Sequence, residues 1–392
     1  MVVRCFWLVG MLLSAAAAHA APRIPPSDAA VLERLPTKPA DASARALRRL
    51  RDAVVSAPSE PDPAAALARR YFELAMAEGD PRYVGYAEGV LLPWRGRSDA
   101  PTGILVLQGL LRQYRHDFDG ALRQLASALE REPHLVEAHA WRAAIYMVQA
   151  KYELALVECA ALSGFASEML ETGCRSSVEG VTGSAAAAYA RLKAVSERFP
   201  RAAPDLKVWI QTRLAELAWR LDRKTQAESH FRDALTLGIT DNYLLAAFAD
   251  FLLEEGRPAE VLRLLRDRER SDTLLLRIAL AEHATKAATA TARARILGER
   301  FHDAALRDER LHLAEEARFL LTLRVDPKAA LLAALENWKT QREPRDAEIL
   351  LEAALAAGKP TAAEPVLSWL SATGCEGARL ARLAEKLRPV RR

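Results

Sequence analysis

Two neighbouring stretches between residues 101 and 168 repeat the same hydrophobic pattern. Phe118 in the first stretch returns 34 residues later as Tyr152, and Ala121 returns as Ala155. A fixed period of this length is typical of stacked helical hairpins, because one hairpin can bury its apolar face only against its neighbours. The repeat therefore predicts a row of hairpins and restricts the architectures that the rest of the chain can adopt.

The period continues along most of the chain with one interruption. Gly183 precedes a further hairpin that Pro200 closes, and an insertion of about five residues around 201–206 then shifts the phase. Between residues 272 and 303 the pattern is weak, but the spacing on either side predicts a drifted hairpin there. The positions that mark successive copies are Ala87, Ala121, Ala155, Ala188, Ala227, Val261, Arg295, Ala329 and Ala363.

Composition agrees with a helical chain. The 392 residues are 51% hydrophobic but only 6% aromatic, with leucine and alanine plentiful, which favours helices over a strand-rich sandwich or barrel. A single hydrophobic core stops growing at about 250 to 300 residues, so a chain of this length divides into domains or stacks repeats. We expect an all-α fold.

Residues 1–20 have the pattern of a secretory signal peptide. Arg4 precedes an apolar run, and an alanine-rich stretch ends at Ala20, a succession typical of a segment that is cleaved on export. The alternative is a membrane anchor, but a span needs about 20 apolar residues and this run is shorter. We expect cleavage after Ala20, a periplasmic or secreted protein, and no membrane span after cleavage.

The charge balance indicates no nucleic-acid partner. Removal of residues 1–20 takes away Arg4 and no acid, so the 55 basic residues fall by one against 51 acidic ones. A nucleic-acid footprint needs basic residues gathered on one face, whereas both signs are interspersed here. The short basic tail that ends at Arg392 is interpreted as solvated.

Three cysteines remain after processing. Cys159 and Cys174 are 15 residues apart, on the second helix of one expected hairpin and the first helix of the next. Export permits a disulfide between them, and two buried free thiols are the alternative. Cys375 is then unpaired. No CxxC pair or histidine cluster accompanies these residues, so we expect no metal site.

Sequence motifs for catalysis or cofactor binding are missing from the chain. It contains no HExxH, no GxSxG, no phosphate-binding GxxxxGK[ST] and no GxGxxG. The acidic pairs Glu254-Glu255 and Glu315-Glu316 lie on amphipathic stretches and are interpreted as solvated. We therefore expect no catalytic residue, no cofactor and no enzymatic activity.

The repeat positions carry a resemblance to a known family. Gly109, Phe118, Ala121, Ala128 and Pro133 in one copy, with Ala143, Tyr146, Tyr152 and Ala155 in the next, resemble the tetratricopeptide repeat. Leu105 and His139 stand where the family has an early aromatic residue, so the copies are divergent. The resemblance implies a right-handed α-solenoid of stacked antiparallel helical hairpins, a superhelix that the amphipathic helix from Gly377 would cap.

The resemblance also implies where a partner would bind. In this family the first helix of each hairpin lines a concave groove, which points to 103–114, 137–148, 209–220 and 243–254. Trp209 and Trp219 could instead pack between hairpins. Where the family binds a peptide carboxylate with Lys and Asn, this chain has residues such as Val106 and Leu110, so that ligand is not expected. The partner-binding candidates are Tyr114, Met147, Trp209, Glu216, Trp219, Arg220, Tyr243 and Asp250.

Three hypotheses for function remain open at this point. The leading one is a non-enzymatic exported scaffold that binds a protein or peptide in the cell envelope; the others are an accessory module or enzyme acting on envelope polymers, and a structural assembly factor that oligomerises. The sequence leaves the oligomeric state open. The expected organisation is a signal peptide at 1–20, a Pro-rich lead-in at 21–41, N-terminal helices and an altered hairpin at 42–100, hairpins at 101–200 and 201–268, divergent hairpins at 269–375, and a capping helix with basic tail at 376–392.

Overall fold

The computed structural model describes residues 42–97, 99–307, 309 and 311–387. The predicted signal peptide, the Pro-rich lead-in and the last five residues of the basic tail lie outside this range. The chain divides into two units, of which the first ends at Ala46 and the second runs from Leu47 to Arg392. α1 begins in the first unit, and all later helices belong to the second.

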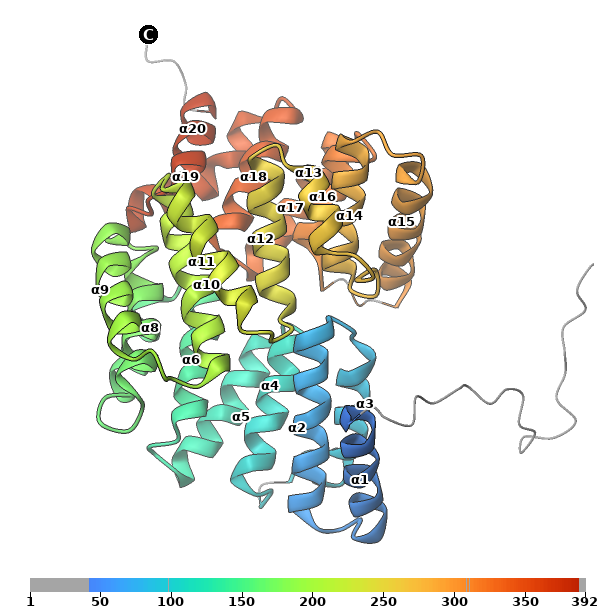
Figure 1. The fold of residues 1–392 in the computed structure, drawn as a ribbon, viewed down its shortest axis with the longest axis vertical. Helices are drawn as coiled ribbons and strands as arrows, with labels where there is room; N and C mark the ends of the chain where they lie inside the picture. The colour runs from blue at the N-terminus through green and yellow to red at the C-terminus, as the bar shows by residue number, and fades with distance from the viewer. Residues whose placement is uncertain (1–41, 98, 308, 310, 388–392) are drawn as a thin grey trace, which may run out of the picture. The chain divides into compact units, whose positions relative to one another are not determined.

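Helices make up the regular structure of the described residues, with no strand among them (Figure 1). After α1 (Ala42–Ser56), consecutive helices pair into nine antiparallel hairpins, and α20 (Ala378–Leu387) follows as the predicted cap. The first five hairpins are α2 (Pro61–Glu78) with α3 (Arg82–Val90), α4 (Thr102–Tyr114) with α5 (Phe118–Arg131), α6 (Val136–Val148) with α7 (Tyr152–Ala161), α8 (Glu168–Glu179) with α9 (Ala185–Arg198), and α10 (Pro204–Arg220) with α11 (Lys224–Thr236).

The remaining four hairpins include the drifted copy expected between residues 272 and 303. Short 3-10 turns, η1 (Leu92–Trp94) and η2 (Pro360–Ala363), accompany the first and last hairpins of the row. The four hairpins are α12 (Asn242–Glu254) with α13 (Pro258–Leu264), α14 (Asp272–Ala284) with α15 (Ala290–Leu306), α16 (Leu313–Thr322) with α17 (Pro327–Thr340), and α18 (Pro344–Ala356) with α19 (Glu364–Thr373).

The turn inside a hairpin follows a common rule. In six hairpins the second residue after the first helix has a left-handed backbone, which ends the helix and reverses the chain. Glycine adopts this conformation without steric cost, yet only two of the six positions are occupied by glycine. The six residues are His116, Ala150, Asp222, Gly256, Lys286 and Gly358.

The small residues of the repeat mark the fourth position of the second helix. Ala121, Ala155, Ala188, Ala227 and Val261 are fully buried there, against the first helix of the same hairpin. Two predicted markers are wrong. Ala329 is half-buried, and the fully buried fourth residue of α17 is Ala330. Arg295 is exposed, and α15 has its fully buried residue, Leu297, about one turn beyond the fourth position.

The predicted insertion lengthens a helix. α10 has 17 residues, whereas α4 and α6 each have 13. The extra residues add a turn at the start of α10, where Pro204 occupies the first helical position. Proline is favoured there because its missing N–H would have no helical partner. The phase slip therefore leaves the hairpin turn after α10 unchanged.

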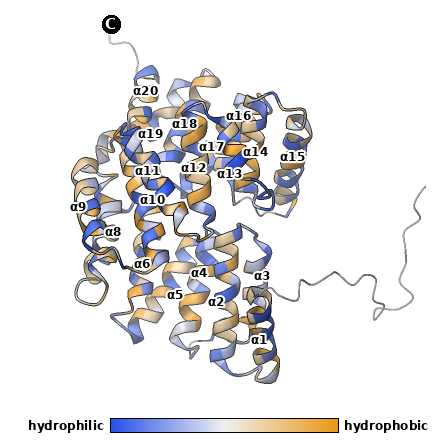
Figure 2. Ribbon diagram, viewed as in Figure 1, coloured by the Kyte–Doolittle hydropathy of each residue, from blue (hydrophilic) through white to orange (hydrophobic). Residues whose placement is uncertain are grey.

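Apolar residues are buried between neighbouring hairpins along the whole row. One cluster joins α1 to α6, a second joins α6 to α8, a third joins α8 to α14, a fourth joins α12 to α16, and a fifth reaches α20. Hydropathy accordingly varies from residue to residue along each helix of the described range (Figure 2). Such packing of each hairpin on its neighbours is how a repeat protein builds a continuous core.

Late hairpins also contact early ones. Trp369 Nε1 donates to the Tyr152 hydroxyl over 3.1 Å, the Ala185 N–H donates to Glu376 over 2.6 Å, and the Arg342 N–H donates to the Val148 carbonyl over 2.7 Å. These bonds close the row of hairpins upon itself.

Gly79 lies at another contact between distant hairpins, at the end of α2. A Cβ atom on this glycine would lie 2.5 Å from Ser271 Oγ and 2.7 Å from Asn242 Oδ1. Its φ angle of 64° also favours glycine. The end of α2 can therefore approach the beginnings of α12 and α14 only because residue 79 has no side chain.

Cys159 on α7 and Cys174 on α8 form a disulfide. Their Cα atoms are 5.6 Å apart, within the usual range for a bridge. The bond lies in the buried cluster that joins α6 to α8. Cys375 is a free, half-buried thiol.

Candidate functional site

A cavity of about 430 Å³ lies inside the row of hairpins. Every first helix contributes to its wall, from α2 through α4, α6, α8, α10, α12, α14 and α16 to α18, and α20 contributes as well. Of the second helices, only α7 reaches the wall, through Tyr152. The cavity exists because the late hairpins return to the early ones and enclose what would otherwise be an open groove.

Seven of the eight partner-binding candidates line this cavity. Trp209 is the exception: it packs against Gly173 of α8, where a Cβ atom would lie 2.3 Å from its ring. Trp209 therefore packs between hairpins, as the alternative interpretation had it. Trp219 lines the cavity and also packs between hairpins, edge-on against Phe251 at 5.7 Å. The seven are Tyr114, Met147, Glu216, Trp219, Arg220, Tyr243 and Asp250.

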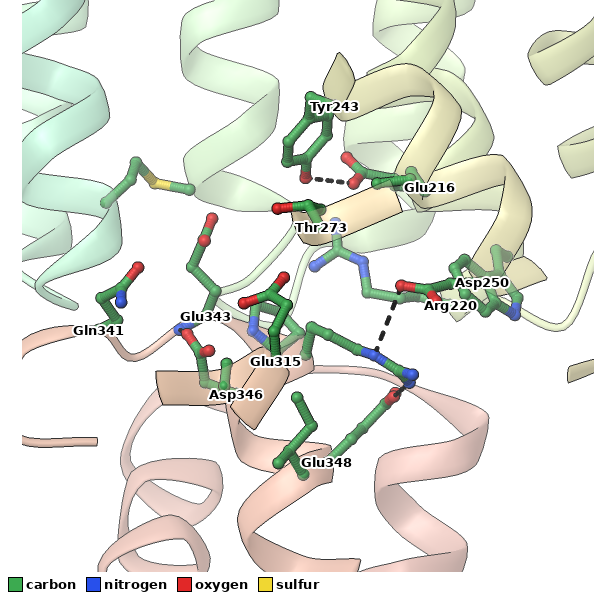
Figure 3. Close-up of a pocket in the computed structure, with 18 of the residues that line it drawn as sticks. Glu216, Arg220, Tyr243, Asp250, Thr273, Glu315, Gln341, Glu343, Asp346 and Glu348 are labelled. Carbon is green, nitrogen blue, oxygen red and sulfur yellow. Dashed lines mark hydrogen bonds and ion pairs between the residues drawn. The ribbon is translucent and has the colours of Figure 1, made fainter. Parts of the chain in front are cut away.

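One wall of the cavity carries a tyrosine held by a charged pair. The Tyr243 hydroxyl donates to Glu216 over 2.5 Å (Figure 3), and Arg213 contacts Glu216 at 3.1 Å. The Arg213 guanidinium also lies over the Tyr243 ring, 4.6 Å from its centre. Tyr243 is 44% exposed, while desolvation raises the pKa of its hydroxyl well above the usual value. Its accessible surface therefore faces the enclosed cavity.

Asp250 of α12 is the centre of an ion-pair network. Its carboxylate accepts two hydrogen bonds from Arg277 of α14, at 3.1 and 2.7 Å, and one from Arg318 of α16 at 2.9 Å. Burial alone would raise the pKa of Asp250, but attraction to the arginines outweighs it and holds this pKa well below its usual value. Burial lowers the pKa of Arg318 to about 10 despite Asp250.

The ion-pair network continues to α20 and includes two glutamates that were expected to be solvated. Arg345 contacts Glu348 at 2.6 Å, and Arg379 contacts Glu254 at 3.1 Å. Glu315, 3.2 Å from Arg277, belongs to the same wall. Glu254 and Glu315 were expected to be solvated, and that expectation is wrong for both. Their side chains are largely buried because the first helices converge on a shared cavity.

Asp346 and Glu343 lie where α18 begins. Asp346 accepts hydrogen bonds from the Asn337 side chain at 2.8 Å and from the Glu343 N–H at 2.9 Å, the second of which caps the helix. Burial, together with the neighbouring Glu343, raises the pKa of Asp346 to about 7. In Figure 3, Glu343 and Asp346 lie on the wall opposite Tyr243 and Glu216, and Glu343 carries no dashed line.

Several residues of the site were not predicted from the sequence. They come from the divergent second half of the chain, where the repeat pattern indicated hairpins but not which face looks inward. Extending the first helices to these copies would have named Arg277, Glu315 and Arg318, but not Glu343 or Arg379, which lie before α18 and on α20. These additional residues are Arg277, Glu315, Arg318, Glu343, Arg345, Asp346, Glu348 and Arg379.

The described residues contain no group of three or more His, Cys, Asp or Glu side chains arranged to hold a metal ion. Within the same range, no helix is both long and apolar enough to cross a membrane. What the cavity offers is hydrogen bonding, ion pairing and aromatic contact.

Comparison with known proteins identifies the fold. No protein-family model matches the chain, and no curated protein matches it. Among solved structures, the crystal structure of the APC/C hetero-tetramer Cut9-Hcn1 is similar, with 14% identity and a TM-score of 0.50 over 88% of this chain and 67% of that chain. The P58(IPK) TPR domain matches with 13% identity over 88% of this chain and 97% of that chain, but its TM-score of 0.21 carries no argument. The chain therefore has the fold of a tetratricopeptide-type helical solenoid.

Proposed function

We propose that this protein is a non-enzymatic, exported scaffold that binds a protein or peptide partner in the cell envelope, and that its cavity holds part of that partner. The observation that carries the proposal is the convergence of all the first helices on one cavity. Solenoids of stacked hairpins bind through extended concave surfaces. Here the late hairpins fold that surface into a partly enclosed site.

The size and lining of the cavity favour a short segment of the partner. A volume of about 430 Å³ is in the range of small-ligand sites, so it admits a few residues and no folded domain. Trp219, Tyr243 and Arg220 belong to the residue types that most often anchor binding surfaces. A protein partner would therefore insert a loop, a terminus or a few side chains.

The ion-pair network around Asp250 is better suited to binding a partner than to catalysis. The arginines and carboxylates around Asp250 neutralise one another, so these groups are not poised to transfer a proton; Glu343 and Asp346 are the carboxyls of the cavity that an enzyme could use. An enzyme acting on envelope polymers would instead need a free acid or base beside the substrate. Turnover of such polymers by the purified chain would overturn the non-enzymatic part of the proposal.

Export is supported by two features of the sequence and structure. Residues 1–20 have the signal-peptide pattern, and Cys159 and Cys174 are bridged, a bond that persists in oxidising compartments. Mass spectrometry of the protein from its native cells should find a chain that begins at Ala21. An intact N-terminus in a cytoplasmic fraction would contradict the proposal.

A binding assay tests the cavity as the partner site. Crosslinking in intact cells identifies a partner, and its affinity is then measured for two variants of the purified chain. Arg220→Ala, inside the cavity, should weaken binding about tenfold or more. Arg295→Ala removes an exposed arginine of α15 outside the cavity and should leave affinity unchanged. Equal affinities for the two variants would exclude the cavity.

A further inference from the structure

Two side chains of the cavity wall carry opposite charges and are left without an ion pair. Arg220 is the last residue of α10, and Glu343 directly precedes α18. Within the described residues, no carboxylate lies within 4.0 Å of the Arg220 guanidinium, and no cationic side chain lies within 4.0 Å of the Glu343 carboxylate. Both are at least half-buried.

This lack of pairing is unusual in the cavity. Around it, Arg213 is paired with Glu216, Arg277 with Asp250, and Arg345 with Glu348. Two other carboxyls that line the cavity have no ion pair among the described residues, the exposed Asp222 and the buried Asp346. Asp346 accepts two hydrogen bonds, and burial together with Glu343 raises its pKa to about 7.

The Arg220 guanidinium also lacks part of its hydrogen bonding. One of its terminal nitrogens, Nη1, is buried and has no hydrogen-bond partner. The nearby Cys375 thiol does not neutralise it, because burial raises the pKa of this thiol above its usual value. A buried guanidinium nitrogen without a partner carries a desolvation cost that an anionic ligand group would remove.

Glu343 is complementary to Arg220 in charge: its side chain takes part in the capping box of α18, but no cationic side chain pairs with it among the described residues. Burial raises the pKa of its carboxyl, and the more distant positive charges of Arg213 and Arg220 only partly oppose this effect. A cationic ligand group beside the carboxylate would favour its ionised form. Figure 3 shows Glu343 facing the space between the two walls, where such a group could lie.

We propose that the cavity binds a compact zwitterionic ligand, with its anionic group on Arg220 and its cationic group on Glu343. This inference rests on the proposed function, because it uses the same cavity. A short peptide with both ends free and a free α-amino acid share this chemistry, and both fit a cavity of about 430 Å³. Met147 and Trp219 supply apolar contacts for the rest of the ligand.

Native mass spectrometry of the full mature chain tests the proposal with defined probes. The probes are an equimolar pool of free tripeptides, the same pool acetylated at the amino end, the same pool amidated at the carboxyl end, and a mixture of the free α-amino acids. The unblocked peptides or the amino acids should bind, and each blocking group should weaken peptide binding about tenfold or more, since each removes one charge-assisted contact. Preference between the two unblocked pools identifies the source of the ligand.

Two variants assign the charges to residues. Glu343→Gln should abolish the effect of acetylation and keep the effect of amidation, whereas Arg220→Gln should do the reverse. Arg220→Lys retains a positive charge and should restore part of the sensitivity to amidation. A thermal midpoint for each variant establishes that it is folded.

Two results would overturn the zwitterion proposal. One is equal binding of blocked and unblocked peptides, and the other is no binding of any probe to the wild-type chain. Failure of the proposed function gives a separate result: a cellular partner would bind the Arg220→Ala variant with the same affinity as the wild-type chain. If the amino acids bind and no peptide does, the zwitterion inference stands and the peptide partner is excluded.

Discussion

Replacing Asp250 by Asn should destabilise the fold more than any surface change. Asp250 is 6% exposed, and its two main partners, Arg277 and Arg318, are 5% and 8% exposed. Removing one member of a buried ion pair costs about 3 to 5 kcal/mol, because the remaining charge is left uncompensated. Asn keeps one oxygen acceptor, so we expect a loss at the lower end, about 3 kcal/mol.

The assay is urea unfolding at pH 7, read as the free energy of unfolding. Arg295→Ala serves as the control, because its ion pair with Glu299 joins neighbouring turns of one helix and both side chains are more than half exposed. This control should change stability by less than about 0.5 kcal/mol.

Coupling provides a second readout. Arg318→Met removes one of the charges that Asp250→Asn leaves uncompensated. The double variant should therefore lose clearly less stability than the sum of the two single variants. A loss below about 1 kcal/mol for Asp250→Asn, or strict additivity with Arg318→Met, would refute the view that this network holds α12, α14 and α16 together.

Three further predictions concern other parts of the fold. Replacing Cys159 and Cys174 by Ser should lower the free energy of unfolding by about 3 kcal/mol, since the bridge closes a 15-residue separation; an unchanged urea midpoint under non-reducing conditions would contradict this. Val325 has a left-handed φ of 54° and is 75% exposed, so Val325→Asn should raise stability by up to about 1 kcal/mol in the same assay. Because Asp346 has a pKa of about 7 in the folded state, above its unfolded value of about 4, its contribution to stability falls as pH rises between these values. In Asp346→Asn the free energy of unfolding should not show this decrease with pH. Identical pH dependence of unfolding for the wild-type chain and the variant would contradict the prediction.

The repeat pattern predicted the helices well because each hairpin is locally encoded. Ala121 and Ala155 recur at one period since small residues are needed wherever paired helices approach closely. Turn residues were harder to recognise, because Ala150 takes a left-handed conformation that is common only for glycine. In the drifted copy the spacing pointed to the exposed Arg295, whereas the fully buried residue is Leu297.

The cavity could be predicted only in part. The first helices α4, α6, α10 and α12 were recognised from the sequence. Tyr243 and Asp250, which were candidates on α12, line the cavity. Its other half depends on contacts between residues far apart in the chain, such as Trp369 with Tyr152. A periodic sequence specifies how neighbouring hairpins stack, but a small rotation per repeat decides which distant hairpins meet.

Site-specific photocrosslinking in intact cells tests most directly whether the cavity is the binding site. A diazirine-bearing aliphatic residue replaces Met147, inside the cavity, or Leu332, which is 70% exposed on α17 and outside it. We predict a discrete adduct with a peptide or protein from position 147 and none from position 332. Adducts from position 332 alone, or the same adduct from both positions, would contradict a partner site inside the cavity.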